Sequence, residues 1–232
     1  MTHSVRMTWV DLAFLHWPVP VETLRPLVPS LLEIETFDGS AWIGVTPFEM
    51  RNVRPLMVLP VPTAMQFPEL NVRTYVKYGG RSGVWFFSLD AGSWLAVAGA
   101  RALVNLPYFH AKMSAMRGPQ GITYRSVRTH PLARSAQFRA RYRPTGDVFT
   151  SVPGSFEHWA TERYSLFSHL PGSGGRLLRL DIEHARWPLQ PGAADIELNT
   201  MAEAARIPLP ATPPRVLFSR SLDVRATWPT PL

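Results

Sequence analysis

One segment decides the fold of this chain: Phe67-Pro68-Glu69-Leu70-Asn71-Val72-Arg73-Thr74-Tyr75-Val76-Lys77. In an extended strand, side chains two residues apart point the same way and lie about 7 Å from each other. One face therefore carries Leu70, Val72, Thr74 and Val76. The other face carries Glu69, Asn71, Arg73, Tyr75 and Lys77. This period predicts a β-strand with one apolar and one polar face.

The polar face of this predicted strand has two interpretations. It is either the solvent-exposed face of an antiparallel sheet, following the usual apolar-in, polar-out rule, or the polar lining of a closed barrel. Exposed strands often repeat Thr, Lys and Glu, whereas this face mixes an acid, an amide, a guanidinium and a phenol. The mixture favours a lining that orients a small polar or anionic ligand.

The 23 prolines and 15 glycines are spread over the whole chain and divide it into short segments. This spacing favours strands over long helices. Hairpins are expected where apolar runs flank turn residues: 31–37 with 41–45 around Asp38-Gly39, 70–78 with 83–89, and 121–129 with 135–143. Further strands are expected over 177–187 and 215–225.

Four short helices are expected beside these strands. Ser93 is a candidate N-cap for a helix over 94–104, and Ser155 for one over 156–163. The other two are expected over 21–28 and 195–206, and loops over 53–68 and 171–175. Together these elements predict one mainly-β domain spanning residues 1–232, with the helices on its outside.

The composition excludes several protein classes. Apolar residues make up 46% of the 232 residues and charged residues 18%, which excludes general disorder. The absence of cysteine excludes disulfides and zinc sites built on sulfur. We find no apolar run as long as a membrane span, of about 20 residues, and no secretory signal pattern at the start. A cytoplasmic protein that does not bind membranes is therefore expected.

Basic residues outnumber acidic ones, with 24 Lys and Arg against 17 Asp and Glu. Lys77 and Lys112 are the only lysines, so arginine carries nearly all of the positive charge. Arginine keeps its proton, whereas a buried lysine can lose it, so amine chemistry has these two side-chain candidates.

Arginine is frequent between residues 124 and 143. Arg139, Arg141 and Arg143 share one face of a predicted strand, opposite Phe138 and Tyr142. A basic strand can bind nucleic acid or another polyanion, which gives an alternative function for the chain. The aromatic residues point away from the arginines, however, and so do not build a stacking platform with them. A solvated strand face is the simpler interpretation, and nucleic acid is not the expected partner.

No metal or cofactor motif is visible in the sequence. None of the seven histidines has the His-Glu-x-x-His spacing of a zinc helix. We also find no Gly-rich phosphate loop, nucleotide fingerprint or nucleophile elbow. No metal and no cofactor is therefore expected. His184 continues the face of Leu178, Leu180 and Ile182; it is either a packed histidine or, if it points into a cavity, a ligand-binding group suited to acid–base work.

The sequence resembles the YqjF-like family, a bacterial family of unknown function. The resemblance spans nearly the whole chain and rests on these segments: His16-Trp17-Pro18-Val19, Gly39-Ser40-Ala41-Trp42-Ile43-Gly44, Glu69-Leu70-Asn71-Val72-Arg73-Thr74-Tyr75, Phe87-Ser88-Leu89-Asp90-Ala91, Leu106-Pro107-Tyr108 and Glu162-Arg163-Tyr164. That family is similar to the acetoacetate decarboxylase superfamily. The resemblance therefore implies an antiparallel, cone-shaped β-barrel with an internal cavity.

The resemblance argues against the chemistry of the decarboxylases themselves. Those enzymes carry an Arg-Glu pair, a short spacer and Pro-Lys-Lys, and the first lysine forms a Schiff base. Arg101 and Pro107 match that pattern, but Ala102 replaces the glutamate, and Tyr108 and Phe109 replace the two lysines. Neither ring can form an imine.

Three further residues are candidates for chemistry at this site. Glu69 matches a cavity glutamate of that superfamily. Lys112 would lie near Tyr108 if residues 108–112 formed a helical turn, and Lys77 shares the polar face of Glu69. A solvated surface amine is the simpler interpretation of both lysines.

We therefore expect a small-molecule-binding protein or enzyme for a small, anionic oxo or carboxylate compound. Glu69 would be the acid or base, Arg73 would bind a carboxylate or enolate-like oxygen, and Tyr108 would donate a hydrogen bond. The expected ligand-binding residues are Asn71, Tyr75, Arg101 and His184. If the protein is catalytic, we expect a proton transfer or a lyase or hydrolase step without a lysine imine. A barrel filled by aromatic side chains is a third possibility, and the sequence leaves a homo-oligomer open.

Overall fold

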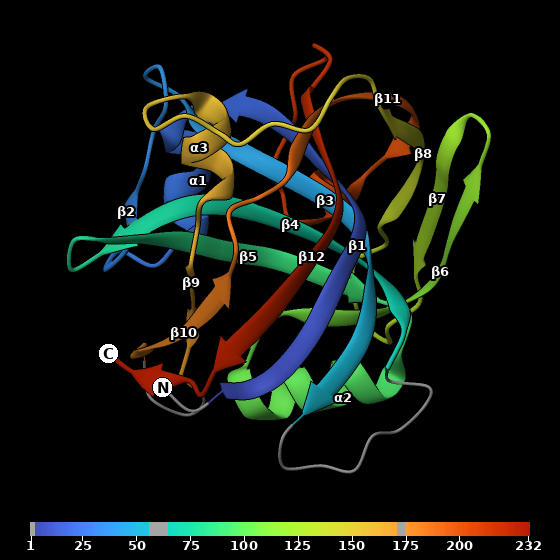
Figure 1. Ribbon diagram of the computed structural model, residues 1–232. Helices are drawn as coiled ribbons and strands as arrows, with labels where there is room; N and C mark the ends of the chain where they lie inside the picture. Colours follow the sequence, from blue (N-terminus) through green and yellow to red (C-terminus); the bar gives the residue numbers. More distant parts are fainter. Residues whose placement is uncertain (1–2, 56–64, 171–174) are drawn as a thin grey trace.

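The computed structural model describes residues 3–55, 65–170 and 175–232 (Figure 1). Its strands are β1 (His3–Val19), β2 (Glu33–Ile34), β3 (Ala41–Pro55), β4 (Phe67–Tyr78), β5 (Arg81–Ala91), β6 (Tyr108–Gly118), β7 (Gly121–Arg128), β8 (Gln137–Pro144), β9 (Ser165–His169), β10 (Leu177–His184), β11 (Leu189–Asn199), β12 (Arg215–Thr227) and β13 (Thr230–Pro231). The helical segments are α1 (Val21–Leu24), the 3₁₀ turn η1 (Arg25–Leu27), α2 (Trp94–Val104), α3 (Phe156–Thr161) and α4 (Met201–Ala204). The predicted mainly-β architecture is confirmed. No helix within these described ranges is long and apolar enough to cross a membrane.

The strands close into two circuits that share one wall. The first circuit runs through β4, β5, β9, β10, β12, β1 and β3, and back to β4. The second leaves β5 through the parallel pair β5–β6 and returns to β12 through β7, β8 and β11. The strands β12, β1, β3, β4 and β5 belong to both circuits, so each face of this wall looks into an interior.

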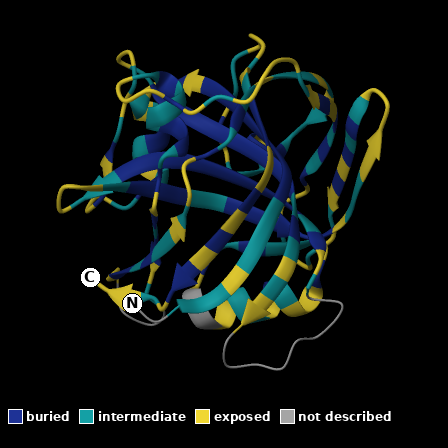
Figure 2. Cartoon of the chain, viewed as in Figure 1, coloured by how far each residue is buried: buried dark blue, intermediate teal, exposed yellow. Residues whose placement is uncertain are grey.

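The two faces of β4 lie in different interiors. Leu70 and Val72 belong to a buried apolar cluster with Tyr124, Phe138 and Tyr142, which come from the outer strands β7 and β8 of the second circuit. The polar face looks into the first circuit, where Phe14, Phe48, Trp187 and Leu217 belong to another buried cluster. Figure 2 shows the consequence: β4 is buried along nearly all of its length, whereas β12 and the β6–β7 hairpin alternate between buried and exposed residues.

Short helices cover both ends of the first circuit. The N-cap Ser93 of α2 accepts a hydrogen bond from the backbone N–H of Ala96, and Val97 packs into the cluster below it, as the sequence predicts. Ser155 caps α3 in the same way, and Phe156 packs on Trp42 at the other end. Because both ends are covered, groups on the inner face of β4 are shielded from bulk water.

The predicted hairpins are confirmed in part. β4 and β5 pair as expected, as do β7 and β8. Asp38 and Gly39 form a tight turn with positive φ angles of 51° and 75°, which suits a two-residue hairpin turn. The strand before this turn was predicted wrongly, however, because only β2 forms there, and β2 pairs with β4 instead of β3. Residues 56–64 and 171–174 of the predicted loops lie outside the described residues.

Two other predictions were wrong or incomplete. The predicted helix over 195–206 is instead the end of β11 followed by α4. Residues 195–199 pair with β8, and this pairing overrides the helix expected there, whereas the alanines after residue 200 do form α4. The strand β6 was not predicted from the sequence. Residues 108–112 belong to this strand and do not form a helical turn.

One close contact gives a test of the circuit closure. A Cβ at Gly83 on β5 would lie 2.5 Å from the carbonyl oxygen of Ser165 on β9, whereas a Cβ at Gly99 on α2 meets nothing within 4 Å. Gly83→Ala should therefore lower the free energy of unfolding by about 1–3 kcal/mol through overpacking. Gly99→Ala is the matched control, and should raise it by about 0.5–1 kcal/mol because alanine favours a helix. Urea unfolding measures both, and equal stability of the two variants would contradict the tight β5–β9 contact.

Candidate functional site

The inner face of β4 buries an unusual amount of polar chemistry. Relative exposures are 2% for Glu69, 5% for Asn71, 9% for Arg73 and 0% for Tyr75. All four point into the first circuit because they alternate with the apolar residues of the opposite face. Burial of polar groups without partners costs free energy, so the partner of each group defines what the face can do.

Glu69 is held by two phenols. Tyr108 donates a hydrogen bond from its hydroxyl to Oε2 of Glu69 at 3.0 Å, and Tyr124 donates to the backbone carbonyl of Glu69 at 2.7 Å. Burial raises the pKa of the Glu69 carboxyl to about 8; the Tyr108 hydrogen bond opposes this rise, and the nearby Asp90 adds to it. Glu69 is therefore mainly protonated at neutral pH and can donate a proton.

The position of Tyr108 is set by its strand and by a helix. Tyr108 begins β6 and lies opposite Leu89 in the parallel pair with β5. Arg101, near the end of α2, donates from Nη1 to the backbone carbonyl of Tyr108 at 2.8 Å. Burial raises the pKa of the Tyr108 phenol well above its usual value, and the charge of Glu69 raises it further. Tyr108 is thus a neutral hydrogen-bond donor aimed at Glu69.

Asn71 and Arg73 leave buried polar atoms free. Oδ1 of Asn71 and Nε of Arg73 have no hydrogen-bond partner among the described residues. Thr46, which lies opposite Asn71 on β3, has an unpartnered Oγ1 as well. Gly44 lies opposite Arg73, and a Cβ there would lie 3.5 Å from Nε of Arg73 and 3.4 Å from the hydroxyl oxygen of Tyr75. The missing side chain at Gly44 leaves room next to these groups.

His16 completes the face from β1. Its Nε2 lies 2.5 Å from the hydroxyl oxygen of Tyr75, and its buried Nδ1 has no partner among the described residues. Burial lowers the pKa of His16 well below its ordinary value, and the positive charges of Arg73 and Arg215 lower it further. Burial likewise raises the pKa of Tyr75. Both members of this pair are therefore neutral at pH 7.

Phe14 brings these polar groups next to an aromatic wall. Its ring centroid lies 5.3 Å from Cζ of Arg73, 6.0 Å from the ring of His16 and 4.9 Å from the ring of Trp187. The indole Nε1 of Trp187 is a further buried donor without a partner in the described structure. A site with an apolar wall and a few polar groups is typical of small-molecule binding.

The structure places the predicted site residues in two groups. Glu69, Asn71, Arg73, Tyr75 and Tyr108 are buried, and their contacts with the first-circuit cluster place them on one inner face. The other two predicted ligand-binding residues differ: Arg101 lies apart from this face, whereas His184 contacts Trp187 of its aromatic wall and has a buried Nε2 without a partner among the described residues. Arg101 is exposed, and its guanidinium binds the backbone of β6 outside the circuit. His184 is half-buried, and its ring stacks on Tyr164 and contacts Trp187.

Neither lysine reaches the inner groups. Lys77 lies opposite Glu33 and Ser82 at the far end of β4, where it is half-buried. Lys112 is exposed on β6. Within the described residues, three or more His, Cys, Asp or Glu side chains do not gather into a possible metal site.

Sequence reasoning missed His16, Thr46 and Gly44. The first lies on β1, which was not predicted, although Val5, Met7 and Trp9 alternate there with Ser4, Arg6 and Thr8 in the period of a strand. Thr46 and Gly44 lie on β3, and they belong to the site only because they pair with Asn71 and Arg73 on β4. The turn signal at Asp38-Gly39 predicted a strand over 41–45, but no local signal predicted which residues of β4 it would pair with.

Comparisons with known proteins find relatives over nearly the whole chain. The family model DUF2071, described as "Uncharacterized conserved protein", matches residues 6–223. The chain is 44% identical over 225 residues to the "Uncharacterized protein YqjF" of Bacillus subtilis (strain 168), covering 97% of this chain and 90% of the relative.

Two solved structures show the likeness of the fold. Acetoacetate decarboxylase from Legionella pneumophila matches with a TM-score of 0.66 at 14% identity, over 99% of this chain and 87% of that one. The enduracididine biosynthesis enzyme MppR, complexed with pyruvate, matches with a TM-score of 0.67 at 13% identity, over 100% of this chain and 91% of that one. The acetoacetate decarboxylase-like fold predicted from the sequence is confirmed.

The raised pKa of Glu69 predicts how stability depends on pH. The unfolded chain loses this proton near the ordinary value of 4.5, and the folded chain loses it near 8. Between these values the folded state binds more protons, so wild-type stability falls as pH rises. Glu69→Gln has no proton to lose here, so its stability lacks this pH dependence. The free energy of unfolding of the variant minus that of wild type should therefore increase by up to about 1.4 kcal/mol per pH unit in this window, and level off above it.

Urea unfolding between pH 5 and 9 measures this difference. The exposed Glu203→Gln on α4 is the matched control, and should follow the wild-type pH profile. A stability difference between Glu69→Gln and wild type that stays constant with pH would show that Glu69 is ionised in the folded protein.

Proposed function

The chain belongs to the DUF2071 family of uncharacterized conserved proteins and has the acetoacetate decarboxylase-like fold, and on that basis we propose that it binds a small oxo or carboxylate compound on the inner face of β4. One observation carries this proposal. Buried polar atoms of Asn71, Arg73, His16 and Thr46, unpartnered among the described residues, gather on one face beside the protonated Glu69. Buried polar groups are nearly always hydrogen-bonded, so a set of free ones calls for a ligand or ordered water.

The charges on this face favour an anionic ligand. Arg73 is a buried guanidinium, and no ion pair links it to a carboxylate within the described residues. His16 and Glu69 are neutral at pH 7, so a bound carboxylate meets the positive charge of Arg73, with Arg215 close enough to act on His16 as well. The apolar wall around Phe14 and Trp187 strengthens such a pair by excluding water. The structural neighbours support the same ligand class, because one is an acetoacetate decarboxylase and the other is complexed with pyruvate.

Glu69 is the proton-transfer group of this proposal. In its protonated form Glu69 donates its proton to the carbonyl oxygen of the ligand, and the carboxylate that results takes a proton from the carbon next to that carbonyl, which leaves the enol; the same two transfers in reverse restore the oxo acid. Tyr108 stabilises that carboxylate through the hydrogen bond it already donates. No lysine imine takes part, because Lys77 and Lys112 lie away from Glu69 and Arg73. The reaction class is proton transfer next to a carbonyl group, as in a lyase or hydrolase step.

Binding is tested with a steric variant that leaves every charge in place. Gly44→Ala should put a methyl group against Nε of Arg73 and the hydroxyl of Tyr75. Titration calorimetry with 2-oxo and 3-oxo acids should show binding to wild type. Gly44→Ala and Arg73→Gln should each weaken it at least about tenfold, the value of a charge-assisted hydrogen bond. Gly99→Ala, which adds the same methyl group on α2, should bind as wild type does.

Proton transfer is tested separately in deuterated water. Wild type should exchange the hydrogens next to the carbonyl of a bound oxo acid, at a rate that NMR measures. Glu69→Gln should bind the acid and exchange it much more slowly. Unchanged binding in both Gly44→Ala and Arg73→Gln would remove the inner face from the function. Binding without Glu69-dependent exchange would leave a binding protein and reject the catalytic role.

A second candidate function rests on the exposed face of β7 and β8. Arg125 lies directly opposite Arg139 in the β7–β8 register, and like charges in such positions repel each other. Arg141 and Arg143 are exposed on the same face, while Tyr124, Phe138 and Tyr142 point into the core. Glu197 pairs with Arg139 and Gln120 binds Arg141, which offsets part of the charge. We propose this face as an electrostatic site for a single-stranded nucleic acid.

Salt dependence gives the test of this second candidate. Neutralising a phosphate contact lowers the slope of log affinity against log salt by about 0.7 for single strands. Arg125→Gln with Arg141→Gln should therefore lower the slope for an oligonucleotide by about 1.4. Arg6→Gln with Arg225→Gln is the matched control, because these arginines form an exposed, opposed pair on β1 and β12. No binding by wild type at low salt, or equal losses in both double variants, would reject this function.

A further inference from the structure

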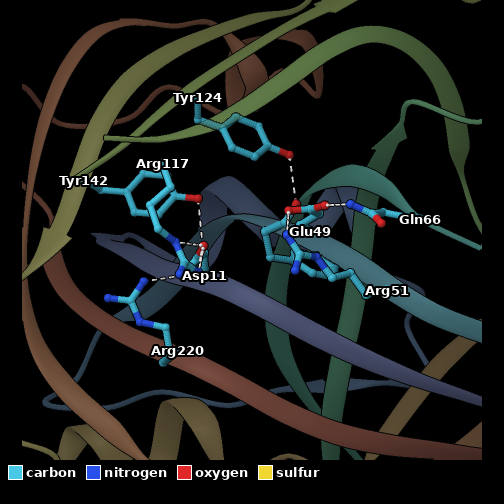
Figure 3. Close-up of polar contacts among 9 residues, drawn as sticks. Asp11, Glu49, Arg51, Gln66, Arg117, Tyr124, Tyr142 and Arg220 are labelled. Carbon is cyan, nitrogen blue, oxygen red and sulfur yellow. Dashed lines mark hydrogen bonds and ion pairs between the residues drawn. The ribbon is translucent and has the colours of Figure 1, made fainter. Parts of the chain in front are cut away.

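A second polar site lies in the other interior, at the end of the second circuit (Figure 3). A hollow of about 70 Å³ opens there, which is room for several water molecules. Its lining comes from β1, β3, β6, β7 and β8: Asp11, Glu49, Arg51, Ala115, Arg117, Ile122 and Tyr142. None of these residues lies on the inner face of β4 described above.

Asp11 lies on one side of the hollow and accepts hydrogen bonds from three neighbouring side chains. It has a positive φ of 51° where the β1–β3 register is interrupted, a backbone conformation that is uncommon outside glycine. Arg117 donates from Nη2 to Oδ2 of Asp11 at 2.6 Å, and Arg220 donates from Nη1 to Oδ1 at 2.5 Å. Tyr142 donates its hydroxyl to the backbone carbonyl of Asp11 at 2.9 Å. Both oxygens of the Asp11 carboxylate therefore already have guanidinium partners.

Glu49 on the other side is occupied in the same way. Its Oε2 accepts from Nη2 of Arg51 at 2.9 Å, and its Oε1 accepts from the amide of Gln66 at 2.5 Å. Figure 3 shows Arg51 and Gln66 converging on this carboxylate, beside the group around Asp11. Nε of Arg51 is buried and has no hydrogen-bond partner among the described residues.

The charges around the hollow do not cancel. Arg51 and Arg117 of the lining match the carboxylates of Asp11 and Glu49 in number, and Arg220 of β12, which binds Asp11 from outside the lining, adds a third guanidinium. Each guanidinium has five N–H donors, and the carboxylates use only some of them. An excess of positive charge, a buried free donor and an open hollow occur together at this place.

We propose that this hollow is a binding site for a small oxyanion, held between Arg51 of β3 and Arg117 of β6. A carboxylate or phosphate oxygen accepts several N–H groups at once, which is the geometry that guanidiniums favour. Such an anion neutralises the excess charge and links the shared wall to the β6–β7 hairpin. The site shares no residue with the inner face of β4, so it does not depend on the proposed function.

Calorimetry and thermal unfolding test the site with inorganic phosphate, acetate and chloride at equal ionic strength. Phosphate or acetate should bind wild type and raise its melting temperature beyond the effect of chloride. The better of the two identifies the oxyanion class. Arg51→Gln should weaken this binding at least about tenfold, because it removes a charge-assisted donor. Glu49 keeps Gln66 as a partner in that variant.

Two further variants make the result specific. Ala115→Leu fills the hollow without changing a charge, and should abolish binding. Arg54→Gln is the matched control: it removes an exposed arginine from the same strand outside the hollow, and should bind as wild type does. If Ala115→Leu does not fold, anion binding by Arg51→Gln compared with that by Arg54→Gln shows whether the hollow is the binding site. Equal effects of all three anions on wild type, or equal losses in Arg51→Gln and Arg54→Gln, would overturn the proposal.

Discussion

The structure depends on a wall of strands that is covered on both faces. Because β12, β1, β3, β4 and β5 belong to two closed circuits, both faces of β4 point into an interior, whereas β1, β3 and β12 also carry exposed residues such as Arg6, Arg54 and Arg225. In an ordinary antiparallel sheet, one face can satisfy its polar groups with water. Here the polar face of β4 has no such solution, so its groups must find partners inside the protein or in a ligand. The chemistry of Glu69 and Arg73 follows from this constraint.

Two buried carboxyl groups on the wall, those of Asp90 and Glu69, differ in their hydrogen-bond partners. Asp90 on β5 is fully buried, and Arg128 binds both of its oxygens, at 2.6 Å between Nη2 and Oδ1. A pair of this kind joins β7 to the wall and leaves little capacity for chemistry. Glu69, only one strand away, receives a phenol instead of a guanidinium. It therefore keeps its proton at neutral pH, which is the state a general acid needs.

The same contrast separates the two polar sites. On the inner face of β4, neutral groups surround Arg73, with Arg215 close to His16, and an aromatic wall excludes water from them. At the end of the second circuit, Asp11 and Glu49 are already paired with arginines, and the free capacity belongs to the guanidiniums. The first arrangement suits binding with proton transfer, and the second suits binding of an anion alone. Both arise where strands of the shared wall leave room, at Gly44 in one case and beside Ala115 in the other.

The sequence by itself determined the mainly-β class, the alternation of β4, the β4–β5 and β7–β8 hairpins and the capped helices α2 and α3. Each of these has a local signal, such as a period of two, a turn dipeptide or a capping serine. The same alternation placed Glu69, Asn71, Arg73 and Tyr75 on one face. Only the tertiary structure decided that this face looks into an interior, that Tyr108 reaches Glu69 and that Arg101 remains outside. Register and closure join residues far apart in the chain, such as His16 with Tyr75, and no local pattern encodes which strands pair. The helix expected over 195–206 forms only in part for the same reason, because pairing of residues 195–199 with β8 outweighs their local preference.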